Sequence, residues 1–307
     1  MQDLLIIGGG PGGVSAGVYA SRKQLKTVLV AEEWGGQSIV SSEIQNWIGT
    51  IAIPGADLAK ALEKHLKAYA GEFVTIKESV RVASVEKTAE GFLATLSNGE
   101  TVLAKTVLVT SGSARRKLEV PGAETLDHKG LTYCATCDGP LFAGQDVVVI
   151  GGGNAAFETA AQLLAYTKSV TLMNRSDTFK ADPVTIDKLK ADPKMTIITN
   201  VAPTAIVGEK FVSGIRYKDL TSNEEKELAV GGIFVEIGLI PNTGFLATLV
   251  PLDDYKRITI DPWTQQTGTP GVWAAGDCTN IKYHQNNISS GDAVRALEDI
   301  YVHLKTK

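Results

Sequence analysis

The chain has 307 residues, of which 44% are hydrophobic and 21% are charged, with a formal net charge of −4 and a pI of about 5.7. This composition is typical of a soluble globular protein, and the length is sufficient for one or two domains. The small net charge, without runs of like charge, argues against nucleic acid or an anionic membrane as a partner.

The chain begins with a short apolar run, Leu4–Ile7, that leads directly into glycines. This run is far too short for a secretory signal or a membrane-spanning helix, so we expect a cytoplasmic protein without a membrane partner. The same stretch predicts a buried strand at Asp3–Ile7. A second apolar run predicts a strand at Thr27–Ala31, and the residues between the two strands have the pattern of a helix.

The turn between the first strand and the helix reads Gly8-Gly9-Gly10-Pro11-Gly12-Gly13 and contains the pattern G-x-G-x-x-G. Between a strand and a helix this pattern predicts a dinucleotide-binding domain, in which the helix N-terminus faces the phosphates. Gly8 permits the tight turn, Gly10 lets the backbone approach a pyrophosphate, and Gly13 lets the helix pack closely on the strand.

Glu32 lies just past the second strand, where an acidic side chain can accept hydrogen bonds from the adenosine ribose. Ala31 also fits this position, so the register of the strand stays open.

The next part of the chain mixes a loop, a helix and strands. Trp34–Gly49 has no clear period and predicts a long functional loop. Asp57–Ala70 predicts a helix, and Phe73–Leu103 predicts β-structure with a hairpin turn at Asn98-Gly99. Thr106–Thr110 predicts a further buried strand.

A pair of cysteines in Cys134-Ala135-Thr136-Cys137-Asp138-Gly139 follows a linker-like segment from Ala114 to Gly122. Such a pair can close reversibly into a disulfide, and a chain with only three cysteines has no structural disulfide framework. In a reducing compartment a Cys-x-x-Cys is catalytic or metal-binding. A zinc site needs four ligands, and the remaining candidates, Cys278 and the histidines, are scattered, so we expect no metal.

A second glycine loop starts soon after the cysteine pair. A predicted strand at Val147–Ile150 leads into Gly151-x-Gly153-x-x-Ala156, and a helix at Asn154–Tyr166 and a strand at Val170–Met173 follow. The chain therefore repeats one nucleotide-binding plan. A redox-active cysteine pair beside a dinucleotide site implies that electrons pass from a cofactor to sulfur.

The remaining segments predict further strands and a last helix. The strands are expected at Met195–Thr199, Gly214–Lys218, Gly232–Ile237 and Gly271–Asp277, and an amphipathic helix is expected from about Ser290 to Leu304.

Along essentially its whole length the chain resembles the low-molecular-weight, bacterial-type thioredoxin reductases of the FAD-dependent pyridine nucleotide-disulfide oxidoreductase family. In these flavoproteins a nicotinamide domain is inserted into a split FAD domain. The motifs that carry the resemblance are Gly8–Gly13, Gly35-Gly36-Gln37, Asn46-Trp47 with Gly49, Cys134–Gly139, Gly151–Asn154 with Glu158, and Ala274–Asp277. The Cys-Ala-Thr-Cys-Asp-Gly string is the most specific of them.

The resemblance implies an α/β fold of two Rossmann-like, three-layer dinucleotide-binding domains, the second inserted into the first. Residues 1–114 and 245–307 would bind FAD, and residues 115–244 would bind NAD(P)H and carry the Cys-x-x-Cys. The implied activity is that of a thioredoxin-disulfide reductase, in which electrons pass from NADPH through FAD and the Cys134–Cys137 disulfide to oxidised thioredoxin or a thioredoxin-like protein. A homodimer is also implied.

The resemblance also implies individual roles. Cys137 would accept electrons from FAD, Cys134 would attack the partner's disulfide, and Asp138 would act as acid and base with a pKa raised by burial. Asp277 would hold the ribityl chain of FAD, and Cys278 would be a small buried residue. The other residues implied in FAD binding are Gly8, Gly10, Pro11, Gly12, Gly13, Glu32, Gly36, Gln37, Asn46, Gly112, Gly276, His284, Gln285 and Asn286. Those implied in NADPH binding are Gly151, Gly153, Asn154, Ala156, Arg175 and Lys180.

The chain departs from the family pattern where NADPH should bind. The family's His-Arg-Arg cluster, with another Arg four residues later, is replaced by Asn174-Arg175-Ser176 and Lys180. Arg175 can bind a 2′-phosphate through two N–H groups and Lys180 can add a point charge. We therefore expect NADPH to be preferred over NADH by roughly 10- to 100-fold. Near the C-terminus the family's Arg-Gln-Ala becomes His284-Gln285-Asn286.

These departures leave alternatives open. The same enzyme could use a donor other than NADPH, or serve a glutaredoxin-like protein or a peroxiredoxin system. A thiol oxidase that passes electrons from small thiols to O₂ is a further alternative. From a different class, a redox-sensing protein could keep FAD and turn over little.

Overall fold

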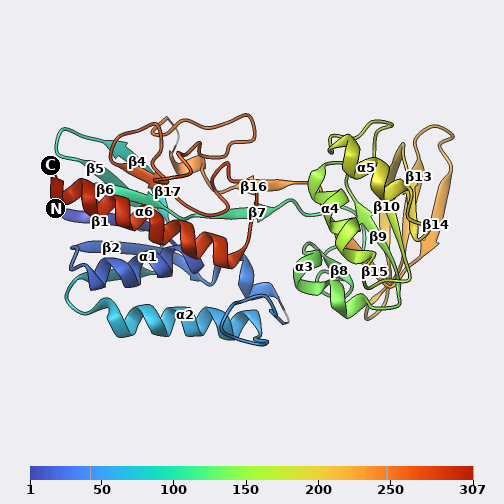
Figure 1. The fold of residues 1–307 in the computed structure, drawn as a ribbon, viewed down its shortest axis with the longest axis horizontal. Helices are drawn as coiled ribbons and strands as arrows, with labels where there is room; N and C mark the ends of the chain where they lie inside the picture. The colour runs from blue at the N-terminus through green and yellow to red at the C-terminus, as the bar shows by residue number, and fades with distance from the viewer. Residues whose placement is uncertain (42, 247, 307) are drawn as a thin grey trace. The chain divides into compact units, whose positions relative to one another are not determined.

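The computed structural model describes residues 1–41, 43–246 and 248–306. Ser42, Ala247 and Lys307, which fall within the predicted FAD domain, lie outside the described residues. The chain forms two compact units: unit 1 comprises Met1–Ala114 and Ile240–Lys307, and unit 2 comprises Arg115–Leu239 (Figure 1). The chain returns to unit 1 at Ile240 rather than at residue 245, because Asn242 forms hydrogen bonds with Ser111 and Gly112.

Unit 1 is organised around a seven-stranded sheet of order β3-β2-β1-β6-β5-β4, in which β17 also pairs with β6. The strands β1, β2, β3, β6 and β17 are parallel, whereas β4 and β5 are antiparallel to their neighbours. The strands are β1 Gln2–Gly9, β2 Thr27–Trp34, β3 Val74–Glu78, β4 Val82–Lys87, β5 Phe92–Leu96, β6 Thr101–Val109 and β17 Val272–Ala274.

Both faces of this sheet are buried because the residues of β1 alternate between two cores. Leu4 and Ile6 pack with α1 (Pro11–Arg22), α2 (Gly55–Ala70) and α6 (Asn286–Thr306). Leu5 and Ile7 pack with residues of β4 and β5 on the other face. Figure 1 shows the three helices along one face of the sheet. Each fully buried Leu or Ile stabilises this arrangement by roughly 1.5–3 kcal/mol.

Unit 2 repeats the same layering. Its parallel sheet has the order β11-β10-β9-β15-β8, and a separate antiparallel sheet has the order β12-β13-β14. Val147 and Val149 of β9 face a core that includes Phe157 of α4, whereas Val148 and Ile150 face a core that includes Ile215 of β13. The strands are β8 Leu131–Thr132, β9 Asp146–Ile150, β10 Ser169–Met173, β11 Met195–Ile198, β12 Val201–Gly208, β13 Val212–Asp219, β14 Glu225–Ala229 and β15 Gly232–Val235. The helices are α3 Ala135–Asp138, α4 Asn154–Leu163 and α5 Pro183–Lys190.

Two short strands, β7 (Ser113–Arg115) and β16 (Leu239–Pro241), lie where the chain passes between the units, and they pair with each other. The fold is therefore α/β with two Rossmann-like units, the second inserted into the first, and the predicted fold class is confirmed.

Several predicted boundaries differ from the structure. The last helix begins at Asn286 rather than Ser290, and the Ser289 N–H donates to the Gln285 carbonyl in the first turn. The predicted loop Trp34–Gly49 contains a short 3-10 helix at Gly36–Val40, and the strand expected at Gly271–Asp277 is limited to β17. The sequence analysis did not predict α5, β12 or β14.

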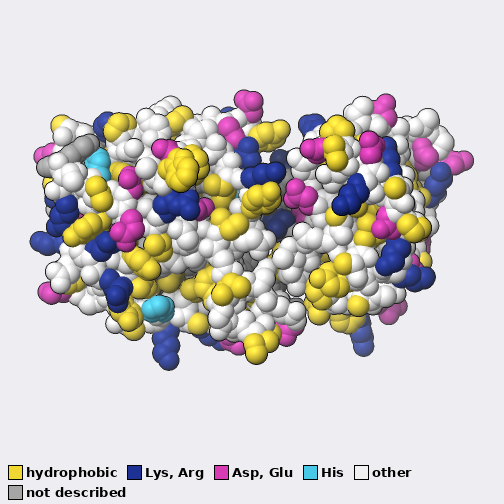
Figure 2. Space-filling model, viewed as in Figure 1, with side chains coloured by type: hydrophobic (Ala, Val, Ile, Leu, Met, Phe, Trp, Pro, Cys, Tyr) yellow, Lys and Arg dark blue, Asp and Glu magenta, His cyan; other side chains and the backbone are white. Residues whose placement is uncertain are grey.

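No helix in the described part of the chain has both the length and the apolar composition needed to span a membrane. On the face drawn in Figure 2, basic and acidic side chains are interspersed over each unit.

Candidate functional site

Unit 1 contains a cavity of about 750 Å³ at the carboxyl ends of β1 and β2. Its lining includes the first glycine loop and residues from six further segments of the unit. Its volume lies within the range of cofactor sites, and the carboxyl edge of a parallel sheet is where nucleotides bind in such folds.

The glycine loop forms one wall of this cavity. A Cβ on Gly8, whose φ is +125°, would lie 2.3 Å from the Thr110 carbonyl oxygen, and a Cβ on Gly13 would lie 1.9 Å from the Gly8 carbonyl oxygen. A Cβ on Gly10 would meet only the Cα of Gly36, at 3.9 Å. Gly8 and Gly13 are therefore required by the fold, whereas Gly10 borders open space in which the phosphates of a ligand can approach.

The register of β2 decides which residue faces the cavity. Ala31 is 1% exposed, and its methyl group lies 2.8 Å from the position of a Cβ on Gly9. Glu32 is exposed and lines the cavity. Of the two residues left open by the sequence, Glu32 is thus placed to accept ligand hydroxyl groups.

Another part of the cavity lining is formed by Gly276, Asp277 and the start of α6. A Cβ on Gly276 would lie 2.8 Å from the Ser289 hydroxyl oxygen, and that hydroxyl donates to Asp277 Oδ1 at 3.5 Å. The His284 Nδ1 lies 3.4 Å from the same carboxylate oxygen. The Ser289 hydroxyl therefore holds Asp277 in place at the cavity, whereas the buried His284 Nδ1 has no hydrogen-bond partner among the described residues.

The loop after β2 is joined to the start of α6 by side-chain amides. The Asn46 Nδ2 donates to Gln285 Oε1 at 3.1 Å, Asn287 Nδ2 donates to the Asn46 carbonyl at 2.7 Å, and the Ser38 hydroxyl donates to Asn286 Oδ1 at 3.0 Å. Asn286 lines the cavity, whereas Asn46, Gln285 and His284 do not. The bond between Asn46 and Gln285 therefore joins the loop to the residue before α6 outside the cavity lining.

The cavity fits FAD in its loop, its helix N-terminus and its polar groups. The buried Ser113 hydroxyl lines the cavity and has no hydrogen-bond partner among the described residues, so it is available to a ligand. The predicted residues that line the cavity are Gly8, Gly10, Pro11, Gly12, Glu32, Gly36, Gln37, Gly112, Gly276, Asp277 and Asn286. Gly13 lies behind the loop. The sequence analysis missed Arg81, Val82, Ala83, Thr110, Ser113, Asn242 and Phe245, whose local sequence carries no nucleotide signal.

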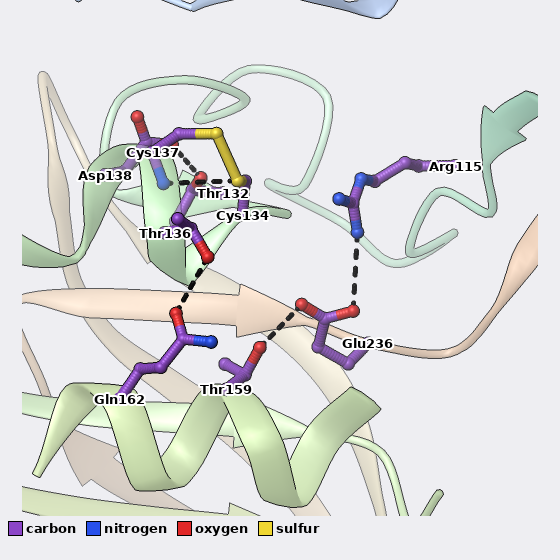
Figure 3. A network of polar contacts seen from close by, with 9 residues as sticks. All are labelled: Arg115, Thr132, Cys134, Thr136, Cys137, Asp138, Thr159, Gln162 and Glu236. Carbon is purple, nitrogen blue, oxygen red and sulfur yellow. Dashed lines mark hydrogen bonds and ion pairs between the residues drawn. A yellow bond between two sulfur atoms is a disulfide. The ribbon is translucent and has the colours of Figure 1, made fainter. Parts of the chain in front are cut away.

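The cysteine pair lies in unit 2, where Cys134 and Cys137 form a disulfide (Figure 3). Cys134 caps the short helix α3, and its sulfur accepts a hydrogen bond from the Cys137 N–H at 3.2 Å. Both cysteines are partly exposed. Thr136 donates to Gln162 of α4 at 2.8 Å and so joins the cysteine loop to that helix. An N–H that points at Cys134 Sγ stabilises the thiolate form that exchange requires.

Asp138 follows the pair directly and is held by the hydroxyl of Thr132 (Figure 3). Burial raises the pKa of Asp138 above the ordinary value of an aspartate, against the opposing effects of the Thr132 hydrogen bond and of the charges of His128 and Arg115. A carboxyl group with a raised pKa beside a disulfide is able to hold a proton for a leaving thiolate.

The second glycine loop lies at the carboxyl end of β9. A Cβ on Gly151, with φ +149°, would lie 2.4 Å from the Glu236 carbonyl oxygen, whereas a Cβ on Gly153 would have no described atom within 4 Å. Ala156 is fully buried in the first turn of α4, and Asn154 Oδ1 accepts from the Asp182 N–H at 2.8 Å. As in unit 1, the second glycine of the motif borders open space, whereas the first and last positions of the motif are closely packed.

The residues after β10 differ in orientation. The Asn174 amide is 8% exposed and turns back onto its own loop, where Nδ2 donates to the Thr178 carbonyl at 2.8 Å. Arg175 and Lys180 are exposed, and the Lys180 N–H donates to the Gly152 carbonyl at 2.8 Å. Lys180 therefore lies beside the glycine loop, as a phosphate ligand would require.

A buried polar group that sequence analysis missed lies on the other side of this loop. The Glu236 side chain, 9% exposed, accepts a hydrogen bond from the Thr159 hydroxyl at 2.8 Å and pairs with Arg115 at 3.4 Å (Figure 3). Burial raises the pKa of Glu236, while Arg115 and Thr159 lower it.

Two further observations concern cysteine and metal chemistry. Cys278 is fully buried, and burial raises the pKa of its thiol to about 11, so it is inert as a nucleophile. Within the described residues, no three His, Cys, Asp or Glu side chains are grouped as metal ligands.

Comparison with known proteins gives consistent matches. A family model for pyridine nucleotide-disulphide oxidoreductases matches residues 2–291. The chain is 42% identical over 294 residues to the F component of alkyl hydroperoxide reductase in Staphylococcus aureus, and 39% identical over 294 residues to an NADH dehydrogenase of Bacillus subtilis. Each match covers 96% of this chain but 57% of the relative, so the chain spans little more than half the length of these curated relatives.

Solved structures of thioredoxin reductases resemble the whole chain. The enzyme of Giardia duodenalis is 30% identical with a TM-score of 0.91, and that of Streptococcus pyogenes is 31% identical with a TM-score of 0.89. Both matches cover 100% of this chain and 99% of the other.

Proposed function

The chain belongs to the pyridine nucleotide-disulphide oxidoreductase family, and we propose that it is a disulfide reductase that uses FAD and a nicotinamide dinucleotide to reduce thioredoxin or a thioredoxin-like protein. The observation that carries the proposal is that unit 2 combines a disulfide, an acid and a dinucleotide loop. A partly exposed Cys134–Cys137 disulfide and a partly buried acid, Asp138, lie in the same unit as a dinucleotide loop.

The two cofactors would bind in different units. Gly8–Gly13, Glu32, Gly112, Asp277 and Asn286 would hold FAD in the cavity of unit 1. Gly151, Gly153, Ala156 and the N-terminus of α4 would hold the dinucleotide in unit 2. When bound, FAD supplies the two-electron chemistry that connects a hydride donor with a disulfide.

The cysteines carry out the exchange in three balanced steps. Two electrons and two protons convert the Cys134–Cys137 disulfide into a dithiol, and one of these protons is exchanged through Asp138 at the sulfur that leaves. The Cys134 thiolate then attacks one sulfur of the partner's disulfide and releases the other as a thiol. Finally Cys137 attacks the Cys134 sulfur, which releases the second partner thiol and restores the Cys134–Cys137 disulfide.

NADPH is the proposed donor, because Arg175 and Lys180 are exposed and Lys180 is joined to the glycine loop. The printed name of the Bacillus subtilis relative supports NADH as the alternative donor. The names of the Staphylococcus aureus relatives support a second partner, a disulfide protein that serves a peroxiredoxin.

The test is anaerobic mixing of the FAD-loaded chain with NADPH or NADH, followed by addition of oxidised thioredoxin or an oxidised glutaredoxin-like protein. Rapid, saturating loss of flavin absorbance and stoichiometric thiol formation in the partner are expected. Slow, non-saturating reduction by both nucleotides would exclude a nicotinamide donor.

Single cysteine variants assign the two sulfurs. Cys134→Ser should leave a Cys137 thiolate that gives a long-wavelength absorbance band with oxidised FAD, whereas Cys137→Ser should lack that band and still react with external disulfides. A long-wavelength band in Cys137→Ser instead would reverse the two roles.

A further inference from the structure

Glu236 lies at the point of unit 2 where the strand order reverses. Gly151 follows β9 and Glu236 follows β15, and these two strands are neighbours at the centre of the sheet. The Glu236 N–H donates to the Ile150 carbonyl at 2.8 Å, which fixes Glu236 against the carboxyl end of β9. In open parallel sheets a dinucleotide binds across this position.

The two sides of the loop differ in chemistry. Arg175 and Lys180 lie on the side of β10, where a cation meets the adenosine end of a dinucleotide. The nicotinamide end therefore lies on the side of β15, the side on which the buried carboxylate of Glu236 is held by Thr159 and Arg115.

The Glu236–Arg115 pair has the hydrogen-bond donors and acceptors needed to bind a carboxamide group. The ion pair is loose, at 3.4 Å, and Arg115 is 32% exposed, so both groups keep hydrogen-bonding capacity for a ligand. The carboxamide of nicotinamide presents an N–H donor and a carbonyl acceptor side by side. A carboxylate beside a guanidinium matches these groups.

We propose that Glu236 and Arg115 recognise the nicotinamide carboxamide, with Glu236 accepting from its N–H, Arg115 donating to its carbonyl, and Thr159 positioning Glu236. This inference rests on the proposed function, because it requires a nicotinamide dinucleotide in unit 2. It assigns to this site two residues outside both glycine loops.

The experiment compares two ligands that differ in one group. Calorimetric titration of the oxidised, FAD-loaded chain with NADP⁺ and with its 3-acetylpyridine analogue, in which a methyl replaces the amide nitrogen, measures the contribution of the carboxamide N–H. NAD⁺ and its analogue are titrated in parallel. Because a charge-assisted hydrogen bond is lost, the analogue should bind about tenfold more weakly to the unmodified chain.

Variants identify the acceptor. Glu236→Gln should reduce the ratio of the two dissociation constants from about tenfold to about threefold or less, since an uncharged acceptor bonds more weakly. Arg115→Met should weaken both ligands equally, because both keep the carbonyl. The matched control is the Arg216–Glu227 pair of β13 and β14, at 2.8 Å, for which Glu227→Gln should leave the ratio unchanged. A ratio of affinities is insensitive to partial loss of folded protein.

The outcomes distinguish a failure of the carboxamide assignment from a failure of the proposed nicotinamide donor. An unchanged ratio in Glu236→Gln, or undiminished binding in Arg115→Met, overturns the carboxamide assignment and leaves the disulfide reductase intact. Absence of binding of all four nucleotides to the unmodified chain overturns the nicotinamide donor and this inference together.

Discussion

The two glycine loops have one plan but differ at the third position of the motif. In unit 1 this position is Gly13, where a Cβ would lie 1.9 Å from the Gly8 carbonyl oxygen. In unit 2 it is Ala156, whose methyl group lies 3.0 Å from the Cβ position of Gly151 and is accommodated. Helix α1 therefore packs more closely on its loop than α4 does, and the two loops tolerate different substitutions.

The residues at the carboxyl end of the second strand, or directly after it, also differ between the units. In unit 1 Glu32 lines a cavity of about 750 Å³. In unit 2 Asn174 is turned inward, and the cations Arg175 and Lys180 are exposed to solvent. An enclosing cavity suits a cofactor that stays bound. An exposed cationic rim, here Arg175 and Lys180, suits a nucleotide that binds and leaves at every turnover.

The largest expected effect tests the difference in loop packing. Gly13→Ala should abolish FAD retention, since the new methyl group has no space beside the Gly8 carbonyl. Gly153→Ala in unit 2 should keep FAD and the unmodified melting temperature, because nothing described lies within 4 Å of its Cβ position. The measurements are the flavin content after gel filtration and thermal unfolding. Equal flavin content in the two variants would contradict the comparison.

The second prediction concerns the partly buried acid of unit 2. Asp138→Asn should lower the rate of partner reduction by about 10²–10⁴-fold, the range for loss of a general acid. The rate at which the nucleotide reduces the bound flavin should change little. Stopped-flow measurement of both half-reactions checks this, with Asp187→Asn on the exposed face of α5 as the control. A matching loss in both half-reactions would assign Asp138 a structural role.

The third prediction concerns the contribution of the cationic rim, Arg175 and Lys180, to the preference for NADPH over NADH. Arg175→Ala should lower the preference for NADPH over NADH by roughly tenfold, because one charge-assisted contact to the 2′-phosphate is lost. Lys180→Ala should have a smaller effect of the same sign, and the exposed Lys188→Ala of α5 should have none. The ratio of flavin reduction rates for the two nucleotides is the measurement. An unaltered ratio in Arg175→Ala would remove this side chain from the phosphate site.

The smallest effect is a change in stability with pH. The pKa of Asp138 is raised in the folded state, so the folded protein binds this proton more tightly than the unfolded chain. Stability therefore falls as the pH rises from the unfolded pKa of an aspartate through the raised folded pKa. Asp138→Asn should melt at a higher temperature than the unmodified chain at neutral pH, and this gain should disappear in acid below about pH 4. A gain of the same size at both pH values would contradict the linkage.

Much of unit 1 could be predicted because its signals are local. Leu4, Leu5, Ile6 and Ile7 form a continuous apolar run, which predicts a strand buried on both faces. In the structure the two faces of β1 lie in separate cores. The glycine loop predicted a nucleotide site from a tight turn and a helix N-terminus alone, and the structure has a cavity at this loop. The prediction of α2 was nearly correct, because Leu58, Leu62 and Leu66 recur at helical spacing.

Other elements had no such signal. α5 is short, and its start depends on the Asp182 side chain, which accepts from the Val184 N–H. β14 has mostly exposed residues and is positioned by pairing with β13 rather than by its own hydrophobic pattern. Such elements are stabilised by neighbours distant in sequence, which no periodicity within the element reveals.

The sequence alone determined the fold class, the repeated nucleotide plan and the disulfide-forming cysteines, because each depends on short motifs whose residues are close together in the chain. Tertiary structure decided which of Ala31 and Glu32 faces the cavity, that Asn174 turns away from the rim, and that Ser113 is left without a partner among the described residues. It also brought Arg115, Thr159 and Glu236 together across more than a hundred positions of the chain. A partly buried ion pair of this kind forms only when separate strands and helices have packed, so its physical cause lies in the assembled unit rather than in any stretch of sequence.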